Sequence, residues 1–175
     1  MHVDTQLEAA LRALDHWPRF RLRLFFEGIV VGILSGTVIS FFRWGLEMGT
    51  VWRQWIYANV LASGGVLLNL SWFGVLLAAA LLLWRLGIYE PNAGGSGIPQ
   101  VKGVILGAIR MRWLRILWVK LVGGIVGIGL GLSLGREGPS IQIGAVTAQG
   151  LSRALGRTRM EERYLITAGA SAGLA

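Results

Sequence analysis

Long apolar runs alternate with short basic clusters along this chain, and the runs predict membrane-spanning helices. No charged residue lies between Arg53 and Arg85, and only Glu27 lies between Arg23 and Arg43. Each interval can hold a spanning helix of about 20 residues. The predicted long helices cover residues 24–48, 65–86 and 114–134.

Two segments rich in glycine and proline interrupt this apolar pattern. Residues 95–99 read Gly-Ser-Gly-Ile-Pro, and residues 135–139 read Gly-Arg-Glu-Gly-Pro. Glycine permits a sharp change of direction, and proline has the fixed φ that suits a first helical turn. The apolar stretch after each segment is short compared with the roughly 20 residues of a spanning helix. We therefore predict short helices that begin inside the membrane, over residues 98–109 and 138–155, and a last helix from about residue 161.

Such helix starts predict an anion site. A helix that begins inside a membrane leaves unpaired backbone N–H groups and the positive end of its dipole at that depth, where an anion is the natural partner. Burying a small anion costs on the order of 20 kcal/mol in the Born limit, whereas one helix end contributes only about 0.3–2 kcal/mol. Direct N–H and O–H hydrogen bonds from several broken helices must therefore replace the lost water.

The composition supports a polytopic membrane protein. The 175 residues are 54% hydrophobic and 15% charged, with a mean hydropathy of +0.59, whereas soluble domains are about 25% charged. The net charge of +8 and the pI near 11.3 would suit a nucleic-acid-binding protein. However, the arginines flank the predicted spans, as the positive-inside bias produces, and no groove-reading motif is present. Phosphate-loop, zinc-protease and catalytic-triad patterns are also missing from the sequence, which argues against an enzyme.

The N-terminal residues predict a surface helix ahead of the membrane core. Leucines recur at helical spacing, which favours an amphipathic helix over residues 3–17 on the cytoplasmic surface. We expect a cytoplasmic segment over residues 1–23 and a membrane core over residues 24–175. The chain stops within a small-residue helix, which suggests a core truncated inside a span. No cysteine is present and His2 and His16 lie far from any acidic cluster, so no metal site is predicted.

The two glycine–proline segments, in this order, resemble the CLC family of chloride channels and chloride/proton exchangers. Lys120 lies between them, and Gln142, Ile143 and Gly144 follow the second segment, as in that family. The resemblance covers residues 24–175 and implies an all-α membrane protein, a CLC-type bundle of tilted spanning helices and broken half-helices. It implies the first of two inverted repeats, incomplete, with the second repeat absent from this sequence.

The resemblance assigns roles to the first segment. Ser96 would donate its hydroxyl to a bound chloride, and Gly97 and Ile98 would donate backbone amides, with Pro99 in support. The family has proline in place of this serine where nitrate is preferred, so Ser96 implies chloride. The alternative is that Ser96 caps the short helix that follows.

Glu137 is expected to be the gate and proton carrier. A carboxylate among the free amides of a helix N-terminus is a tethered anion, which blocks the site until it is protonated or displaced by chloride. The alternative is a carboxylate that only satisfies the helix start. Gly135, Arg136 and Gly138 would complete the chloride site, and Pro139 would support it.

Four further charged residues are interpreted from their positions. Arg136 and Lys120 are basic residues at membrane depth, which makes them functional candidates. We favour scaffolding, combined with long-range attraction of anions, over direct ligation for both. Glu161 and Glu162 stand at a helix start in a basic loop and are interpreted as partners of the helix dipole.

The predicted function is chloride transport across the membrane by coupled exchange with protons, without a cofactor. A passive voltage-gated chloride channel of the same family is one alternative. The other is a non-transporting helical membrane assembly component whose glycine ladder, Gly28, Gly32 and Gly36, only packs helices. The exchanger is favoured because the two segments look prokaryotic-like and no large soluble domain precedes them. The resemblance also implies a homodimer in contact with membrane lipid, in the bacterial inner membrane with a cytoplasmic N-terminus, and no nucleic-acid partner.

Overall fold

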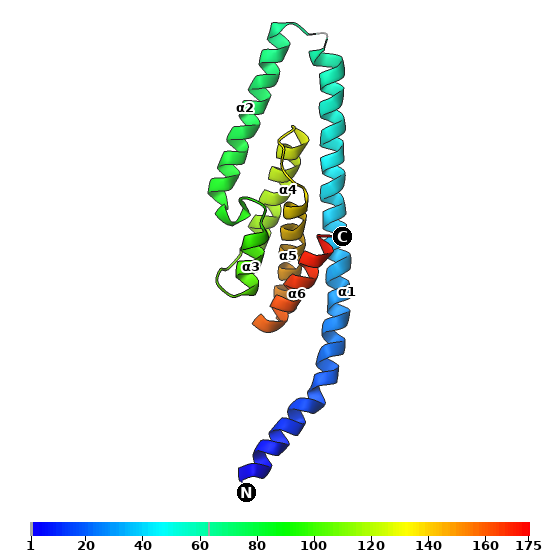
Figure 1. Ribbon diagram of the computed structural model, residues 1–175, viewed down its shortest axis with the longest axis vertical. Coiled ribbons are helices and arrows are strands. Elements are labelled where there is room, and N and C mark those ends of the chain that lie inside the picture. Colours follow the sequence, from blue (N-terminus) through cyan, green and yellow to red (C-terminus); the bar gives the residue numbers. More distant parts are fainter. Residues whose placement is uncertain (1, 63) are drawn as a thin grey trace.

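Helices make up all the regular structure of the described residues (Figure 1). The computed structural model describes residues 2–62 and 64–175, with side chains from residue 22 onward except at 63. The elements in chain order are α1 (His2–Ile56), the π-helical turn η1 (Tyr57–Leu61), α2 (Val66–Tyr89), the 3-10 turn η2 (Pro91–Ala93), α3 (Ile98–Ile105), α4 (Trp113–Gly129), α5 (Glu137–Ala154) and α6 (Arg159–Ala172). The predicted all-α class with short, broken helices is confirmed for this part of the chain.

The first helix is longer than the sequence pattern predicts. Instead of a surface helix over residues 3–17 followed by a span over 24–48, one helix runs from His2 to Ile56. Its N-terminal part projects beyond the other helices and bends relative to the rest (Figure 1). The segments Leu22–Leu61 and Val66–Tyr89 are long and apolar enough to cross a membrane. α2 has no buried residue, and only its side near Leu83 and Leu86 packs against α4 and the core.

One stripe of α1 packs against the central helices. Val31, Ser35, Ile39, Phe42 and Leu46 are all buried, and they recur every three or four residues, which places them on one helix face. In lipid the exclusion of water no longer drives this contact, so close van der Waals packing stabilises it instead. The hydroxyl of Ser35 adds a hydrogen bond to the carbonyl of Gly144 in α5, at 3.2 Å.

The glycine ladder of α1 lies outside this packed stripe. A Cβ placed at Gly28, Gly32 or Gly36 would meet nothing within 4 Å. Within the described residues no other element packs against this ladder, so its interpretation as a helix-packing face stays a prediction. The close contact of α1 lies elsewhere, because a Cβ at Gly49 would lie 2.8 Å from the Cα of Gly129 in α4.

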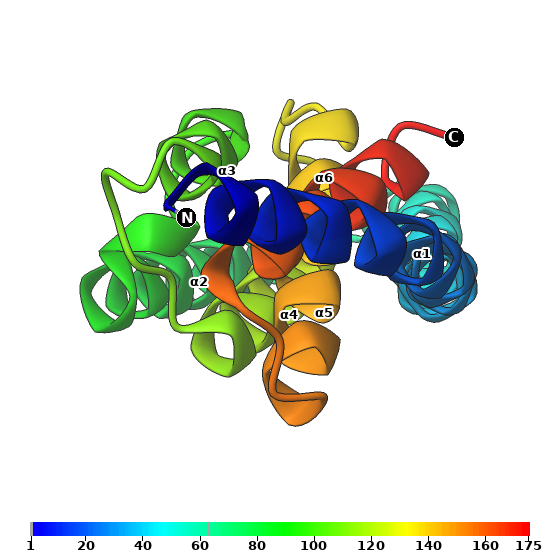
Figure 2. The ribbon, with the colours of Figure 1, turned by 90° about the horizontal axis from the view of Figure 1, so that it is seen from below.

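The centre of the bundle is α5, which is buried along most of its length. Seen from below, the greater part of α1 lies on one side of α5 and α6 and its N-terminal part crosses in front of them, while α2 and α3 lie on the other side (Figure 2). Small residues let α5 and α6 approach closely, since a Cβ at Gly169 would lie 2.6 Å from that of Ala148.

α6 begins with a capping box in which the backbone N–H of Thr158 donates to Glu161 at 2.8 Å. Glu162 instead forms an ion pair with Arg153 at 3.2 Å.

Candidate functional site

The two glycine–proline segments meet in space. A Cβ placed on Gly138 would lie 2.7 Å from the carbonyl oxygen of Ser96 and 2.8 Å from its Cβ. Real Cβ atoms do not approach other atoms this closely, so only glycine fits at position 138 without a shift. The first turn of α5 therefore rests directly on the residue before the N-cap of α3. This contact brings the two predicted helix starts to one place.

The first break is shaped by a left-handed glycine. After η2 the chain runs through residues 94–97, and Gly97 is the N-cap of α3 with φ +85. A side chain is strained at that φ. It would also lack room, because a Cβ at Gly97 would lie 2.6 Å from Cδ of Gln142. Pro99 occupies the first turn of α3, where a backbone N–H would have no partner within the helix, so proline costs no hydrogen bond there.

Gln142 of α5 holds this break in place, a role that the sequence analysis did not predict. It is fully buried, and its Nε2 donates to the carbonyl of Asn92 in η2 at 2.8 Å. Its Oε1 has no hydrogen-bond partner among the described residues. The available signal was an uncharged polar residue in an apolar helix five positions after Glu137, since intramembrane polar residues are seldom without a partner.

Lys120 reaches the same loop from α4. The residue is only 5% exposed, and its Nζ donates to the carbonyl of Gly95 at 2.7 Å. The hydrogen bond fixes the loop before α3 and gives one of its carbonyls a charged donor. The ammonium group also contributes positive charge to the cavity described below.

The second break begins where α4 ends. The chain leaves α4 at Gly129, turns at Gly131 with φ +104, and enters α5 at Glu137. The carbonyl of Arg136, the N-cap residue, accepts hydrogen bonds from the backbone N–H and the hydroxyl of Ser140, at 3.2 and 2.9 Å. No side-chain hydrogen bond caps this helix. The exposed Glu137 therefore stands in the first turn of a helix without a side-chain cap.

A cavity of about 610 Å³ opens between the two breaks. Most of the predicted site residues line it: Ser96, Ile98, Lys120, Gly135, Glu137, Gly138 and Pro139. Three predicted residues do not line it. Gly97 is buried against Gln142, Arg136 is exposed beside the cavity, and Pro99 lies in the first turn of α3.

The cavity combines chemistry that suits an anion. It offers the Ser96 hydroxyl, the N-terminal ends of α3 and α5, and the ammonium group of Lys120. Glu137 is the one carboxylate among the lining residues. No cluster of three or more metal-ligating side chains occurs in the part of the chain that the structure describes. The arrangement can bind a small anion and bring a carboxylate into competition with it.

Comparisons with known proteins show which family the chain resembles. The family model described as "Voltage gated chloride channel" matches residues 73–175, more than half of the chain. The H(+)/Cl(-) exchange transporter ClcA of Vibrio cholerae serotype O1 (strain ATCC 39541 / Classical Ogawa 395 / O395) is 34% identical over 156 residues, which cover 86% of this chain and 32% of that protein. ClcA of Yersinia pseudotuberculosis serotype IB (strain PB1/+) is 31% identical over 165 residues, covering 94% and 34%.

A solved structure of a Cl-/H+ antiporter has a similar fold. The X-ray crystal structure of a slow cyanobacterial Cl-/H+ antiporter superposes with a TM-score of 0.77 at 32% sequence identity, covering 87% of this chain and 36% of that one. The chain thus spans about a third of the length of these relatives. The match confirms the resemblance that the two glycine–proline segments indicate. The chain belongs to the voltage gated chloride channel family, the CLC family.

Proposed function

We propose that this chain supplies part of a transporter that exchanges chloride for protons across a membrane. The observation that carries the proposal is the contact between Ser96 and Gly138, which places the starts of α3 and α5 on one cavity beside Glu137. Relatives named H(+)/Cl(-) exchange transporters support exchange over passive conduction. Exchange would be an activity of the full-length protein, because the relatives named as exchangers are about three times longer than this chain.

Chloride would bind between the two helix starts. The Ser96 hydroxyl is available for it, because the N-cap of α3 is Gly97 and no side-chain hydrogen bond caps that helix. The backbone N–H of Ile98 lies in the first turn of α3, where helix geometry leaves it without an intrahelical partner. Gly135 and Gly138 would supply amides from the second break, and Gly97 would contribute through its backbone turn.

Glu137 would be both gate and proton carrier. Its carboxylate lines the cavity from the first turn of α5, where the helix dipole favours a negative charge. An ionised Glu137 competes with chloride for the same donors, and a protonated one gives them up. Arg136 and Lys120 would act mainly as scaffold and as long-range attraction for anions, Lys120 through its hydrogen bond to Gly95. Pro99 and Pro139 would fix the first turns of α3 and α5.

The membrane setting follows from charge and hydropathy. The loop after α3 and the ends of α5 and α6, which carry Arg110, Arg153, Arg159 and Arg163, would face the cytoplasm, as the positive-inside bias requires. In that orientation the N-terminus would lie on the cytoplasmic side. We further propose a bacterial inner membrane as the location and a homodimer as the assembly. Transport of this kind needs no enzyme chemistry and no cofactor besides the two ions.

Two alternatives are less well supported. A passive chloride channel would use the same site, but the relatives named above are exchangers or antiporters. A non-transporting assembly component would use its glycine ladder, Gly28, Gly32 and Gly36, to pack helices, but it gives no role to Glu137 in a break closed by proline.

The test is ion flux in liposomes that contain the full-length gene product. Glu137→Gln should abolish proton movement driven by a chloride gradient and retain chloride flux, because the amide cannot carry the proton. Glu47→Gln, which changes an exposed carboxylate of α1 outside the cavity, is the matched control and should retain both fluxes. Proton coupling that survives in Glu137→Gln would contradict the proposed role.

A further inference from the structure

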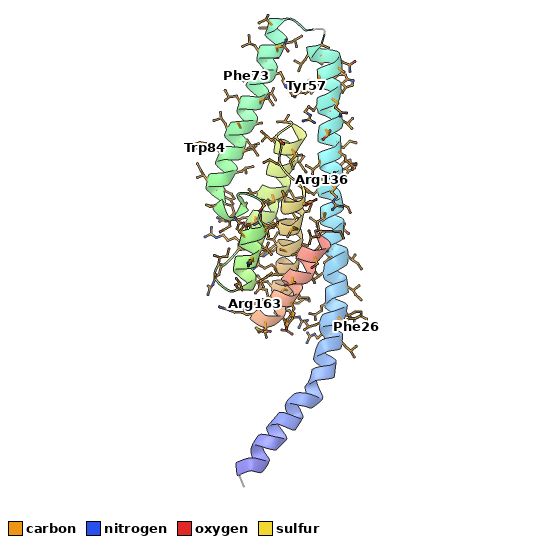
Figure 3. The ribbon with its side chains drawn as sticks, in the orientation of Figure 1. Phe26, Tyr57, Phe73, Trp84, Arg136 and Arg163 are labelled. Carbon is orange, nitrogen blue, oxygen red and sulfur yellow. The ribbon has the colours of Figure 1, made fainter. Side chains whose placement is uncertain are left out.

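A second cavity lies near the far end of the bundle from Glu137. Its volume is about 240 Å³, and it opens between the turn after α3, the last turns of α5 and the first turns of α6. In Figure 3, Arg163 lies near the lower ends of α5 and α6, and Arg136 lies farther up, at the start of α5. We name this cavity the basic pocket; the polar side chains that line it are Arg110, Arg153, Arg159, Arg163, Gln149 and Glu162.

The basic pocket has a strong excess of positive charge. Four guanidinium groups face one carboxylate, and that carboxylate, on Glu162, is already paired with Arg153 at 3.2 Å. Among the described residues, no ion pair is formed by Arg110, Arg159 or Arg163. The guanidinium of Arg163 lies directly over Gly107, where any side chain would collide with it. Several guanidinium groups around one small cavity are the arrangement that binds phosphate through paired N–H donors.

The inner wall of the basic pocket carries an unpaired acceptor. Gln149 of α5 is only 2% exposed, and its Oε1 has no hydrogen-bond partner among the described residues. A buried polar atom without a partner is costly, so a donor from a ligand would stabilise it. A halide has no hydrogen to donate and cannot fill this role. A ligand that carries both a phosphate and a hydroxyl can satisfy the arginines and Gln149 together.

The surroundings of the basic pocket are apolar. Leu106 and Ile109 lie on either side of the turn at Gly107, and Met160 adjoins Arg159; all three side chains are exposed. Apolar side chains around a basic pocket, at the end of a membrane bundle, suit a lipid whose chains lie outside and whose headgroup lies inside. Basic pockets between transmembrane helices on the cytoplasmic side bind lipid headgroups in this way.

We infer that the basic pocket binds a phosphoglycerol group, with the phosphate held by Arg159 and Arg163 and a glycerol hydroxyl donating to Oε1 of Gln149. An anionic phospholipid of the phosphatidylglycerol type and a soluble glycerol phosphate share this chemistry. The basic pocket shares no lining residue with the proposed transport cavity, so this proposal does not depend on chloride exchange.

Native mass spectrometry of the full-length gene product tests the site. Phosphatidylglycerol should form retained adducts and phosphatidylcholine should not. The double variant Arg159→Gln/Arg163→Gln should lower phosphatidylglycerol affinity by about tenfold, as expected for the loss of charge-assisted hydrogen bonds. The control Arg112→Gln/Arg115→Gln removes the same charge outside the basic pocket and should bind as the wild type does. Equal binding by the pocket variant, or an equal loss in the control, would overturn the site.

A second variant tests the hydroxyl contact without removing charge. Gln149→Met keeps the volume of the side chain and removes the acceptor. It should abolish the preference for phosphatidylglycerol over phosphatidic acid, which has no glycerol hydroxyls; an unchanged preference would overturn the assignment. Displacement of the lipid by millimolar glycerol phosphate would support the phosphoglycerol site with a soluble occupant. Failure of that displacement would support the same site with the membrane lipid as occupant.

Discussion

Gly138, in the first turn of α5, lies so close to Ser96 that a Cβ on the glycine would come within 2.8 Å of the serine Cβ. The two residues come from separate helix breaks, and their contact sets the distance between the two helix starts. The position of Glu137 depends on it as well, since Glu137 directly precedes Gly138 in the same turn. The geometry of the proposed anion site thus depends on a close contact that only glycine permits.

Gly138→Ala should destabilise the protein and weaken chloride binding. The added methyl group has no space, and overpacking of this kind costs about 1–3 kcal/mol. Thermal unfolding in detergent and chloride titration by calorimetry measure the two effects. Gly28→Ala is the matched control, because its Cβ would meet nothing within 4 Å. It should leave the protein as stable or more stable, since alanine favours a helix over glycine by up to about 1 kcal/mol. Equal stability of both variants would refute the close contact.

Ser96→Ala should weaken chloride binding without unfolding the protein. The variant loses one hydroxyl donor to an ion, and a hydrogen bond to a charged group contributes about 1.5–3 kcal/mol, which is roughly tenfold or more in Kd. Ser71→Ala removes a hydroxyl that bonds to the carbonyl of Leu68 in α2, far along the chain from the cavity, and should bind chloride normally. Chloride affinity that is unchanged in Ser96→Ala would remove this hydroxyl from the site.

Ser96→Pro should shift the selectivity of the transporter from chloride toward nitrate. The family resemblance links proline at this position to nitrate preference, and the substitution also removes the hydroxyl donor. The ratio of nitrate to chloride flux in liposomes is the measurement. A ratio equal to that of the wild type would show that the residue does not contact the transported anion.

Lys120→Met should destabilise the loop before α3 and have little effect on the affinity for chloride. The carbonyl of Gly95 would lose its charged donor, and a hydrogen bond to a charged group contributes about 1.5–3 kcal/mol. Lys102→Met is the control, since Lys102 is exposed on α3. Thermal unfolding should separate the two lysine variants. A large loss of chloride affinity in Lys120→Met with unchanged stability would instead identify a direct ligand.

Local sequence signals predicted the breaks more accurately than the long helices. The starts of α3 and α5 were predicted to within one residue, because a glycine turn and a proline in the first helical turn mark them directly. The extent of α1 was not predicted, because the helix continues both through Pro18 and past the charged residues Arg43 and Glu47, which do not stop a helix by themselves. Periodic glycines such as Gly28 mark only where a close approach is allowed, and whether a helix approaches there depends on partners that local sequence does not show.

Long-range contacts within the site were predicted only in part. The convergence of the two segments followed from the need for several donors around one anion. The hydrogen bond from Gln142 to Asn92 did not, because it joins residues fifty positions apart through a fold that composition does not specify. The position of Arg136 was not predicted either. This residue belongs to the predicted motif, but it does not line the cavity.

The most direct measurement is the anomalous scattering of bromide in crystals of the full-length protein. Bromide replaces chloride and is located without reference to any assumed ligand. We predict a bromide peak in the cavity between α3 and α5, within hydrogen-bond distance of the Ser96 hydroxyl and beside Glu137. A cavity without bromide, in crystals where Ser96 and Glu137 are well ordered, would contradict the claim that the starts of α3 and α5 bind the transported anion.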